Sequence, residues 1–160
     1  MNKQETYQYL TEQGVAYEVT EHEAVYNMEE LEAVALPYPE WDAKNLFVRD
    51  DKRRGYYLIT VKGDKRVDLK AFRKQHGLRV LSFASAEELD EMLGLPSGAV
   101  TPLGLLHDKE HRVRFYLDAA FEGNRIGIHP NDNTATVWMR AGDLMALLRQ
   151  NGVEAEWTEV

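Results

Sequence analysis

Three short segments of this sequence contain residue types that could bind or activate a substrate. Lys44–Asp50 begins with a cation and an amide side chain ahead of an apolar run. Gly98–Pro102 starts with glycine and ends with proline, so its backbone can bend and point N–H groups at a ligand. Gly127–Thr134 carries His129 before a turn rich in asparagine. Each segment also has a plain structural interpretation, since exposed lysines, connecting loops and hydrogen-bonded histidines are common.

The sequence lacks several residue types and motifs, and their absence excludes several kinds of catalytic site. The chain contains no cysteine, which excludes disulfides, thiolate zinc sites, iron–sulfur clusters and cysteine nucleophiles. It also contains no GxSxG nucleophile elbow, no Walker loop and no GxGxxG dinucleotide motif. Any catalysis must therefore use other groups.

His107 and His111 have the spacing that two zinc ligands share on a helix. They flank a predicted turn between strands, however, where such positions do not share a face, and no third ligand lies nearby in the sequence. We therefore expect no metal and no cofactor. A metal hydrolase that uses this pair is kept as an alternative.

The charge is distributed unevenly along the chain. The whole sequence has a net charge of −8, but Lys44–Arg79 contains 12 basic and 4 acidic residues and carries +8, so the remainder carries −16. A basic segment can contact phosphates, while an acidic remainder discourages indiscriminate binding to nucleic acid. The alternative is an ordinary solvated surface.

Helices are predicted where apolar residues recur at helical spacing between a capping residue and a glycine. They are an opening helix that ends at Gly14, a helix capped by Asn27 with Glu30, and helices within Asp68–Gly77, Ser85–Gly94 and Asp143–Gln150. Because residues before proline disfavour the helical conformation, Pro37 and Pro39 predict a loop over Leu36–Trp41.

Strands are predicted where apolar and polar residues alternate or where β-branched and aromatic residues cluster. They cover Val15–Val19, Leu46–Val48, Tyr56–Val61, Leu105–Leu106, Val113–Leu117, Ile126–Ile128 and Ala135–Met139. The second and third form a predicted hairpin around Gly55, and His107–His111 is a predicted turn between strands. Strands in the middle and second half with helices interspersed indicate an α+β fold on a mixed, largely antiparallel sheet.

The chain shows no linker, repeat or low-complexity tract, so we expect a single domain over residues 1–160. No apolar run approaches the roughly 20 residues that a membrane helix needs. The first 13 residues are too polar for a signal peptide. A cytoplasmic location without membrane contact is therefore expected.

Together, in this order and at these separations, the three segments resemble the YbaK-type aminoacyl-tRNA deacylase superfamily, which is related to the editing domain inserted in bacterial prolyl-tRNA synthetase. Within that superfamily, five segments resemble the free-standing Ala-tRNA(Pro) deacylase branch, also called the prolyl-tRNA synthetase associated domain. They are Lys44–Asp50, Gly63–Leu69, Leu81–Ala84, Gly98–Pro102 and Gly127–Thr134. His22–Tyr26 resembles the exit of the family's first strand. The resemblance runs from the first predicted helix to the last and implies a YbaK-like fold.

The resemblance also implies an activity. It is hydrolysis of the ester that joins a wrongly attached alanine to the terminal adenosine of proline tRNA, without metal or cofactor. The implied partners are the acceptor end of mischarged tRNA(Pro) and, transiently, prolyl-tRNA synthetase. Selection would rest on pocket volume, since a synthetase pocket sized for proline cannot strongly reject a smaller residue.

Individual roles follow from the same resemblance. The implied catalytic groups are a cation and a backbone bend: Lys44, Gly98, Ala99, Val100, Thr101 and Pro102. The implied substrate contacts, which include a histidine that lines the aminoacyl pocket, are Asn45, Leu46, His129 and Thr134. The implied tRNA phosphate contacts are Arg49, Lys52 and Arg79. Leu46, Val100 and Ile128 would lie near the pocket walls.

One segment departs from the family pattern, and two functional alternatives stay open. The loop Pro37–Asp42 is bulkier and more acidic than expected just before Lys44. Relatives in the superfamily remove cysteine, serine or threonine, so deacylation of another mischarged tRNA is one alternative. A tRNA-binding module without catalysis is the other.

Overall fold

The computed structural model describes residues 1–24, 29–30 and 35–160. In these residues the α-helices are α1 (Lys3–Glu12), α3 (Leu69–His76), α4 (Ala86–Leu93) and α5 (Ala141–Gln150). Short 3₁₀ helices are η1 (Pro39–Trp41), η2 (Ser97–Ala99), η3 (Pro102–His107) and η4 (Ala119–Phe121). The helix predicted after Asn27 depends on residues that lie outside the described ones.

The strands form two sheets. They are β1 (Tyr17–Glu21), β2 (Ala43–Asp50), β3 (Tyr56–Lys62), β4 (Leu81–Phe83), β5 (Val113–Asp118), β6 (Arg125–Ile128), β7 (Ala135–Arg140) and β8 (Ala155–Thr158). One sheet is antiparallel in the order β1-β7-β6, and the other has the order β4-β2-β3-β5-β8. In the second sheet β2 pairs antiparallel with β3 and β4, while β5 pairs parallel with β3 and β8. The α+β class and the mixed, largely antiparallel pairing are confirmed.

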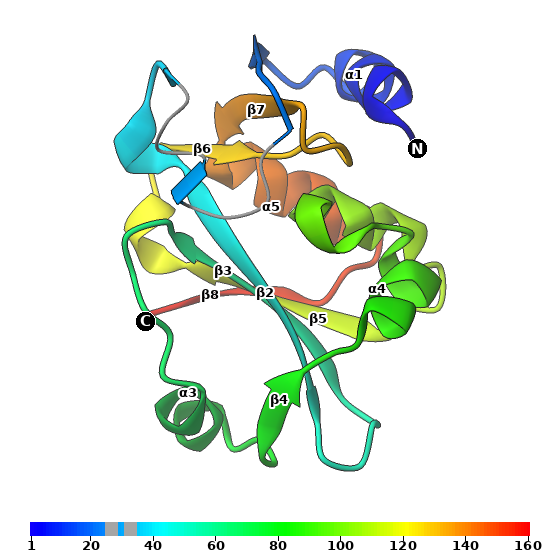
Figure 1. Cartoon of the computed structure of the whole chain (residues 1–160), viewed down its shortest axis with the longest axis vertical. Helices are drawn as coiled ribbons and strands as arrows, with labels where there is room; N and C mark the ends of the chain where they lie inside the picture. Colours follow the sequence, from blue (N-terminus) through cyan, green and yellow to red (C-terminus); the bar gives the residue numbers. More distant parts are fainter. Residues whose placement is uncertain (25–28, 31–34) are drawn as a thin grey trace.

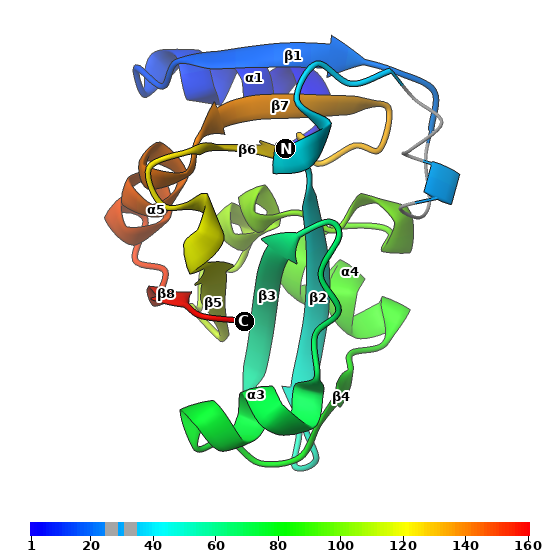
Figure 2. The same ribbon diagram turned by 90° about the vertical axis from the view of Figure 1, so that its left-hand side faces the viewer.

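The three-stranded sheet lies across one end of the long β2–β3 hairpin (Figures 1 and 2), with α1 on its far side. A bridge between Asp42 and Gly127 joins the start of β2 to β6. The strand that carries Lys44 therefore begins beside the strand that leads to His129. This junction positions two of the three segments singled out in the sequence.

Two apolar clusters fill the interior. The larger packs side chains of both sheets against α4 and α5, and the smaller packs one face of the β2–β3 hairpin against α3. Because side chains alternate along a strand, Phe47 of β2 belongs to the larger cluster and Val48 to the smaller. The two faces of β2 therefore pack in different apolar clusters.

The capping signals located the middle helices correctly. Asp68 accepts hydrogen bonds from the first turn of α3, and Ser85 with Glu88 forms the capping box of α4. Gly77 and Gly94 end these helices in the left-handed conformation, with φ of 66° and 65°. Both helices are confirmed, as are α1, α5 and the β2–β3 hairpin.

The strand predicted at Leu105–Leu106 is wrong. Both leucines lie in η3, which Thr101 caps by accepting from the Leu103 amide and which begins with proline. A short apolar run has no period that separates a strand from a buried helical turn. The His107–His111 turn consequently connects η3 to β5, and not two strands of a hairpin. No helix within the described residues is long and apolar enough to cross a membrane.

Candidate functional site

Lys44 and Asn45 are neighbours in β2 and face opposite ways. The Lys44 ammonium donates to the carbonyl of Lys65, in the loop after β3, whereas Asn45 Oδ1 accepts from the Thr60 hydroxyl at 2.6 Å. Asn45 therefore shares the face of Phe47 and the larger cluster. The expected cation lies on the other face of the strand.

The Gly98–Pro102 bend is built from a short helical turn and an extended step. η2 closes with the Ala99 amide donating to the Pro96 carbonyl at 3.0 Å, and Thr101 then takes an extended conformation before Pro102 opens η3. Among the described residues, no hydrogen bond engages the amides of Val100 or Thr101. Val100 is half-buried, so its amide can be offered to a ligand, whereas Thr101 is 0% exposed.

A hydrogen bond joins this bend to the histidine segment. The buried Thr101 hydroxyl donates to the carbonyl of His129 at 2.6 Å. Residues 28 positions apart in the sequence are thereby held together. The structure thus brings together two of the predicted site segments, while the Lys44 ammonium donates to the Lys65 carbonyl.

The imidazole of His129 has a defined orientation. Its Nδ1 lies 3.0 Å from the carbonyl oxygen of Ala135, and because a carbonyl can only accept, Nδ1 carries the proton. Burial lowers the pKa of His129 below its usual range, and the Ala135 carbonyl only partly opposes this. The neutral ring keeps an unprotonated Nε2, which can accept a hydrogen bond.

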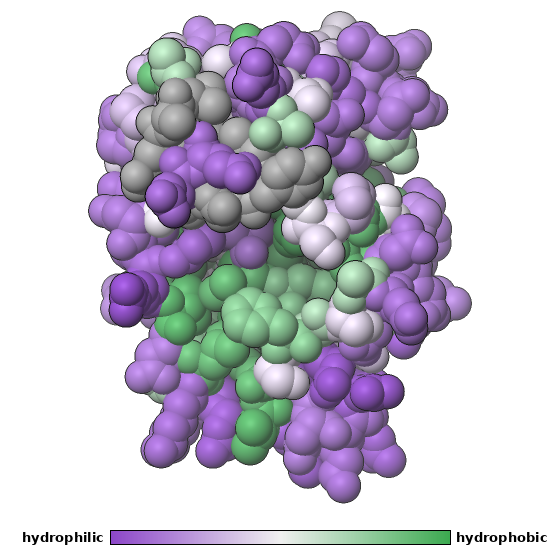
Figure 3. All heavy atoms as spheres, in the orientation of Figure 1, coloured by the Kyte–Doolittle hydropathy of each residue, from purple (hydrophilic) through white to green (hydrophobic). Residues whose placement is uncertain are grey.

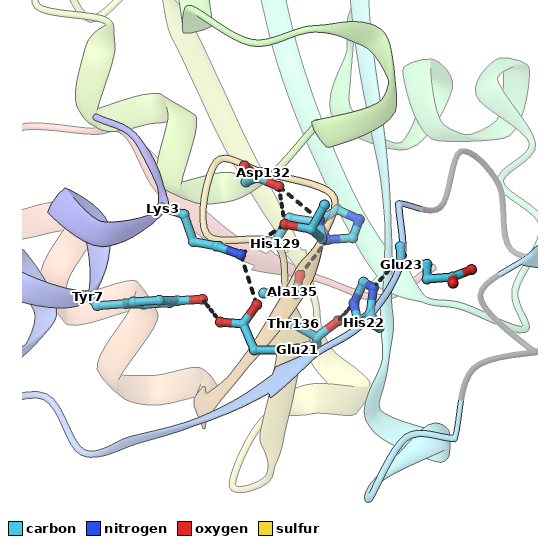
Figure 4. A network of polar contacts seen from close by, with 10 residues as sticks. Lys3, Tyr7, Glu21, His22, Glu23, His129, Asp132, Ala135 and Thr136 are labelled. Atoms are coloured by element: carbon cyan, nitrogen blue, oxygen red, sulfur yellow. Dashed lines mark hydrogen bonds and ion pairs between the residues drawn. The ribbon is translucent and has the colours of Figure 1, made fainter.

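The hydroxyl of Thr134 forms hydrogen bonds within the protein. It donates to Asp132 Oδ1 at 2.5 Å and accepts from the Lys3 ammonium at 2.9 Å. Lys3 also pairs with Glu21 at 2.8 Å (Figure 4). Hydrogen bonds from Thr134 hold the pKa of Asp132 below its usual range, so this carboxylate stays charged. Thr134 can accept from a substrate but has no second proton to donate.

A second histidine supports the same region. His22 Nδ1 lies 2.8 Å from the Glu23 carbonyl and its Nε2 lies 2.9 Å from the Thr136 hydroxyl, with the ring edge-on to His129 at 6.3 Å between centroids. In the sequence, His22 stands out only as part of the segment that resembles the exit of the family's first strand. Lys3 and Asp132 carry no local signal, because no spacing links an opening helix to a turn more than a hundred residues later.

The predicted phosphate contacts lie at the opposite end of the hairpin (Figure 2). Arg49 lies 3.3 Å from Glu88, and Arg79 makes two hydrogen bonds to Asp51 at 2.7 and 3.1 Å. Arg79 holds the pKa of Asp51 below its usual range. Lys52 is exposed at the hairpin turn. Two of the three basic groups thus face carboxylates of their own chain, and their role toward tRNA stays a prediction.

An apolar area covers the face seen in Figure 3, over β2 and β4. Val80, just before β4, and Phe83, at its end, have exposed side chains. Leu46 and Val100 are half-buried, and Ile128 is 2% exposed and belongs to the core. Val100 and Ile128 pack in the larger cluster, whereas Leu46 packs against the smaller cluster on the other face of β2.

His107 and His111 lie at the two ends of the connection between η3 and β5. His107 ends η3 against Gly94, and His111 has a φ of 54° and lies against Gly152. Within residues 1–24, 29–30 and 35–160, no group of three His, Cys, Asp or Glu side chains could hold a metal ion.

Comparison with known proteins assigns this arrangement to a family. The model of the aminoacyl-tRNA editing domain matches residues 22–147, and the chain belongs to that family. The chain is therefore an aminoacyl-tRNA deacylase. The family match spans all three segments that the sequence analysis singled out.

Relatives and solved structures agree with this assignment. The chain is 38% identical over 144 residues to the prolyl-tRNA editing protein ProX of Acetoanaerobium sticklandii, covering 89% of this chain and 88% of that protein. It is 34% identical to prolyl-tRNA synthetase associated domain-containing protein 1 of Bos taurus, covering 91% and 87%. A solved structure of a candidate trans-editing enzyme for prolyl-tRNA synthetase has the same fold, with a TM-score of 0.71, 24% identity and coverage of 100% and 98%.

Proposed function

We propose that this protein is a trans-editing hydrolase that removes alanine from mischarged tRNA(Pro). The observation that supports it most is the hydrogen bond from Thr101 to His129, which joins a bend with free amides to an imidazole with a free nitrogen. The names of the relatives, a prolyl-tRNA editing protein and a prolyl-tRNA synthetase associated protein, support proline tRNA as the carrier.

Hydrolysis of the ester needs an oriented water and donors for the developing oxyanion. In the proposed mechanism water attacks the carbonyl carbon, and the amide of Val100 donates to the oxygen as it gains charge. The bond to the ribose oxygen then breaks, and that oxygen takes up the proton that the attacking water loses. The products are alanine and tRNA with a free terminal hydroxyl.

His129 would select the substrate rather than move protons. Its Nε2 is an acceptor, and the α-ammonium of an aminoacyl ester is a donor, so the two fit without any change of protonation. Half-buried Val100 would limit the space beyond, admitting a methyl side chain and excluding the proline ring. A difference of one or two methylenes gives about 1–3 kcal/mol of discrimination by binding alone, so exclusion by volume has to add to it.

Lys44 would act after a change of side-chain position. Its ammonium rests on the Lys65 carbonyl, but the flexible four-carbon stem of lysine lets the charge move when a phosphate or oxyanion arrives. The proposal therefore includes an exchange of the Lys65 carbonyl for the substrate's terminal nucleotide. The acceptor end of tRNA(Pro) is the partner, and prolyl-tRNA synthetase is proposed as a transient second one.

The test is alanine release from Ala-tRNA(Pro) by the wild type and by Lys44→Ala. We expect the wild type to release alanine and the variant to lose at least 100-fold in rate with an unchanged melting temperature. Lys109→Ala, which removes an exposed lysine beyond η3, is the matched control and keeps the wild-type rate. Full activity of Lys44→Ala would remove the lysine from the mechanism, and no release by the wild type would leave only a tRNA-binding module.

A further inference from the structure

A groove of about 480 Å³ lies at the end of β6 that is farthest from His129. It is bounded by the start of β6, the end of β7 and the start of β1, and Trp41 of η1 closes one side. The bulky loop that departs from the family pattern therefore borders this groove. Nothing in the proposed hydrolysis uses it.

The groove carries an excess of positive charge in an acidic protein. Its ionisable lining residues are Arg125, Arg140 and Glu18. Neither arginine forms an ion pair with any of the described residues, and both are exposed. Glu18 accepts a hydrogen bond from the Tyr38 hydroxyl at 2.7 Å. Two unpaired guanidinium groups at one mouth favour an anionic ligand, and their planar forks match a phosphate.

Aromatic rings contact two cations at this groove and line part of it. The Arg125 guanidinium lies 3.7 Å from the centroid of the Tyr38 ring, and the Lys62 ammonium lies 4.7 Å from that of Trp41. Tyr17 and Trp41 are half-buried, so part of each ring faces solvent. Exposed aromatic surface beside arginines is the combination that binds single-stranded nucleic acid, where bases stack and phosphates meet cations.

We propose that this groove binds a nucleotide of the single-stranded acceptor end of tRNA, with its phosphate at Arg125 and Arg140 and its base against Tyr17 and Trp41. The inference rests on the proposed function, because it takes tRNA as the ligand. Arg125 and His129 are separated by four strand steps, about 13 Å at ~3.3 Å per residue. A short stretch of single strand spans that distance, so one tRNA end can occupy both places.

The experiment is equilibrium binding of uncharged tRNA(Pro), labelled on its 5′ end, at several salt concentrations. We expect Arg125→Gln with Arg140→Gln to weaken binding about tenfold and to lower the slope of log K against log salt by roughly one to two, because two phosphate contacts are lost. Arg140→Gln alone removes an exposed side chain that makes no ion pair with the described residues, and shows part of both effects. Glu18→Gln, which removes the groove's carboxylate, tightens binding. Lys109→Gln with Arg112→Gln removes the same amount of charge elsewhere and leaves binding within twofold of the wild type.

Unchanged affinity and salt slope in both arginine variants would overturn the proposal. Titration with free CMP and AMP distinguishes a free mononucleotide from the end of tRNA as the ligand of the groove. If the double variant loses mononucleotide binding but keeps its affinity for tRNA, the groove does not bind tRNA and the proposal is also overturned. The proposed function fails separately, because the wild type could release no alanine while the arginine variants still weaken tRNA binding.

Discussion

His129 has one ring nitrogen left for a substrate. The Ala135 carbonyl fixes the proton on Nδ1, and burial keeps the ring neutral. The Thr134 hydroxyl, in contrast, donates its hydrogen bond to Asp132 and accepts one from Lys3, so it mainly holds the turn after β6 against α1. Both residues were expected to contact substrate, but their hydrogen bonds suit them to different tasks. His129 can meet the substrate directly, and Thr134 positions the loop.

A buried carboxylate predicts how stability depends on pH. Asp42 is 5% exposed, and burial raises its pKa to about 7, with only the Ala43 backbone amide opposing this. The folded state therefore favours the protonated form, and stability is lost as the pH rises from the unfolded pKa near 4 through 7. Between pH 5 and pH 8 the loss is about 2 to 3 kcal/mol.

Urea unfolding of the wild type and of Asp42→Asn at pH 5 and pH 8 measures this contribution. The variant carries no titrating group at this position, so its stability should decline less over the same range by about that amount. Equal declines in the two proteins would show that Asp42 is charged in the folded state.

At the scale of elements, the contact between the bend and the end of β6 holds the site together. Thr101→Val keeps the side-chain shape but removes the donor to the His129 carbonyl, leaving that carbonyl unpaired. We expect about 1–3 kcal/mol lower stability and at least tenfold slower alanine release, because the Val100 amide loses its position. Unfolding and single-turnover deacylation measure the two effects.

Thr101→Ser is the matched control, since it retains the hydroxyl and should recover most of the rate. If Thr101→Val were as active as Thr101→Ser, the hydrogen bond would not position the bend. Serine keeps the hydroxyl of threonine but lacks its methyl group, whereas valine keeps the shape and lacks the hydroxyl. A packing defect alone would therefore not make Thr101→Val slower than Thr101→Ser.

The sequence predicts elements best where the signal is local. α3 and α4 were located from their capping residues and final glycines, which act within a few residues of each helix end. β4 and β8 were missed, since strands of three and four residues have too few positions to show a period. η3 was mistaken for a strand for the same reason.

The site was predictable in its segments and not in its side-chain directions. Resemblance identified the Gly98–Pro102 and Gly127–Thr134 segments, which the structure joins through Thr101. The face on which Lys44 lies depends on where β2 begins, and the strand starts at Ala43, earlier than predicted. The Lys3 contact depends on how α1 packs, which no local pattern records.

At the scale of the whole molecule, cations without ion pairs lie at both ends of the hairpin. The +8 segment includes β2, β3 and α3, and Arg49 and Arg79 in it face carboxylates. Lys52, Arg53 and Arg54 at the hairpin turn are exposed and make no ion pair with the described residues, as is also true of Arg125 and Arg140 at the groove. Of these two groups, only the arginines of the groove lie on the strands of the sheet that leads to His129.

The central claim is that this junction hydrolyses an ester chosen by the size of its amino acid. The most direct test charges tRNA(Pro) separately with alanine, serine, cysteine and proline and measures amino-acid release in single turnover. We expect alanine to be released fastest and Pro-tRNA(Pro) to remain intact over the same time. Release of proline as fast as alanine would contradict selection by volume, and faster release of serine or cysteine than of alanine would assign the enzyme a different substrate.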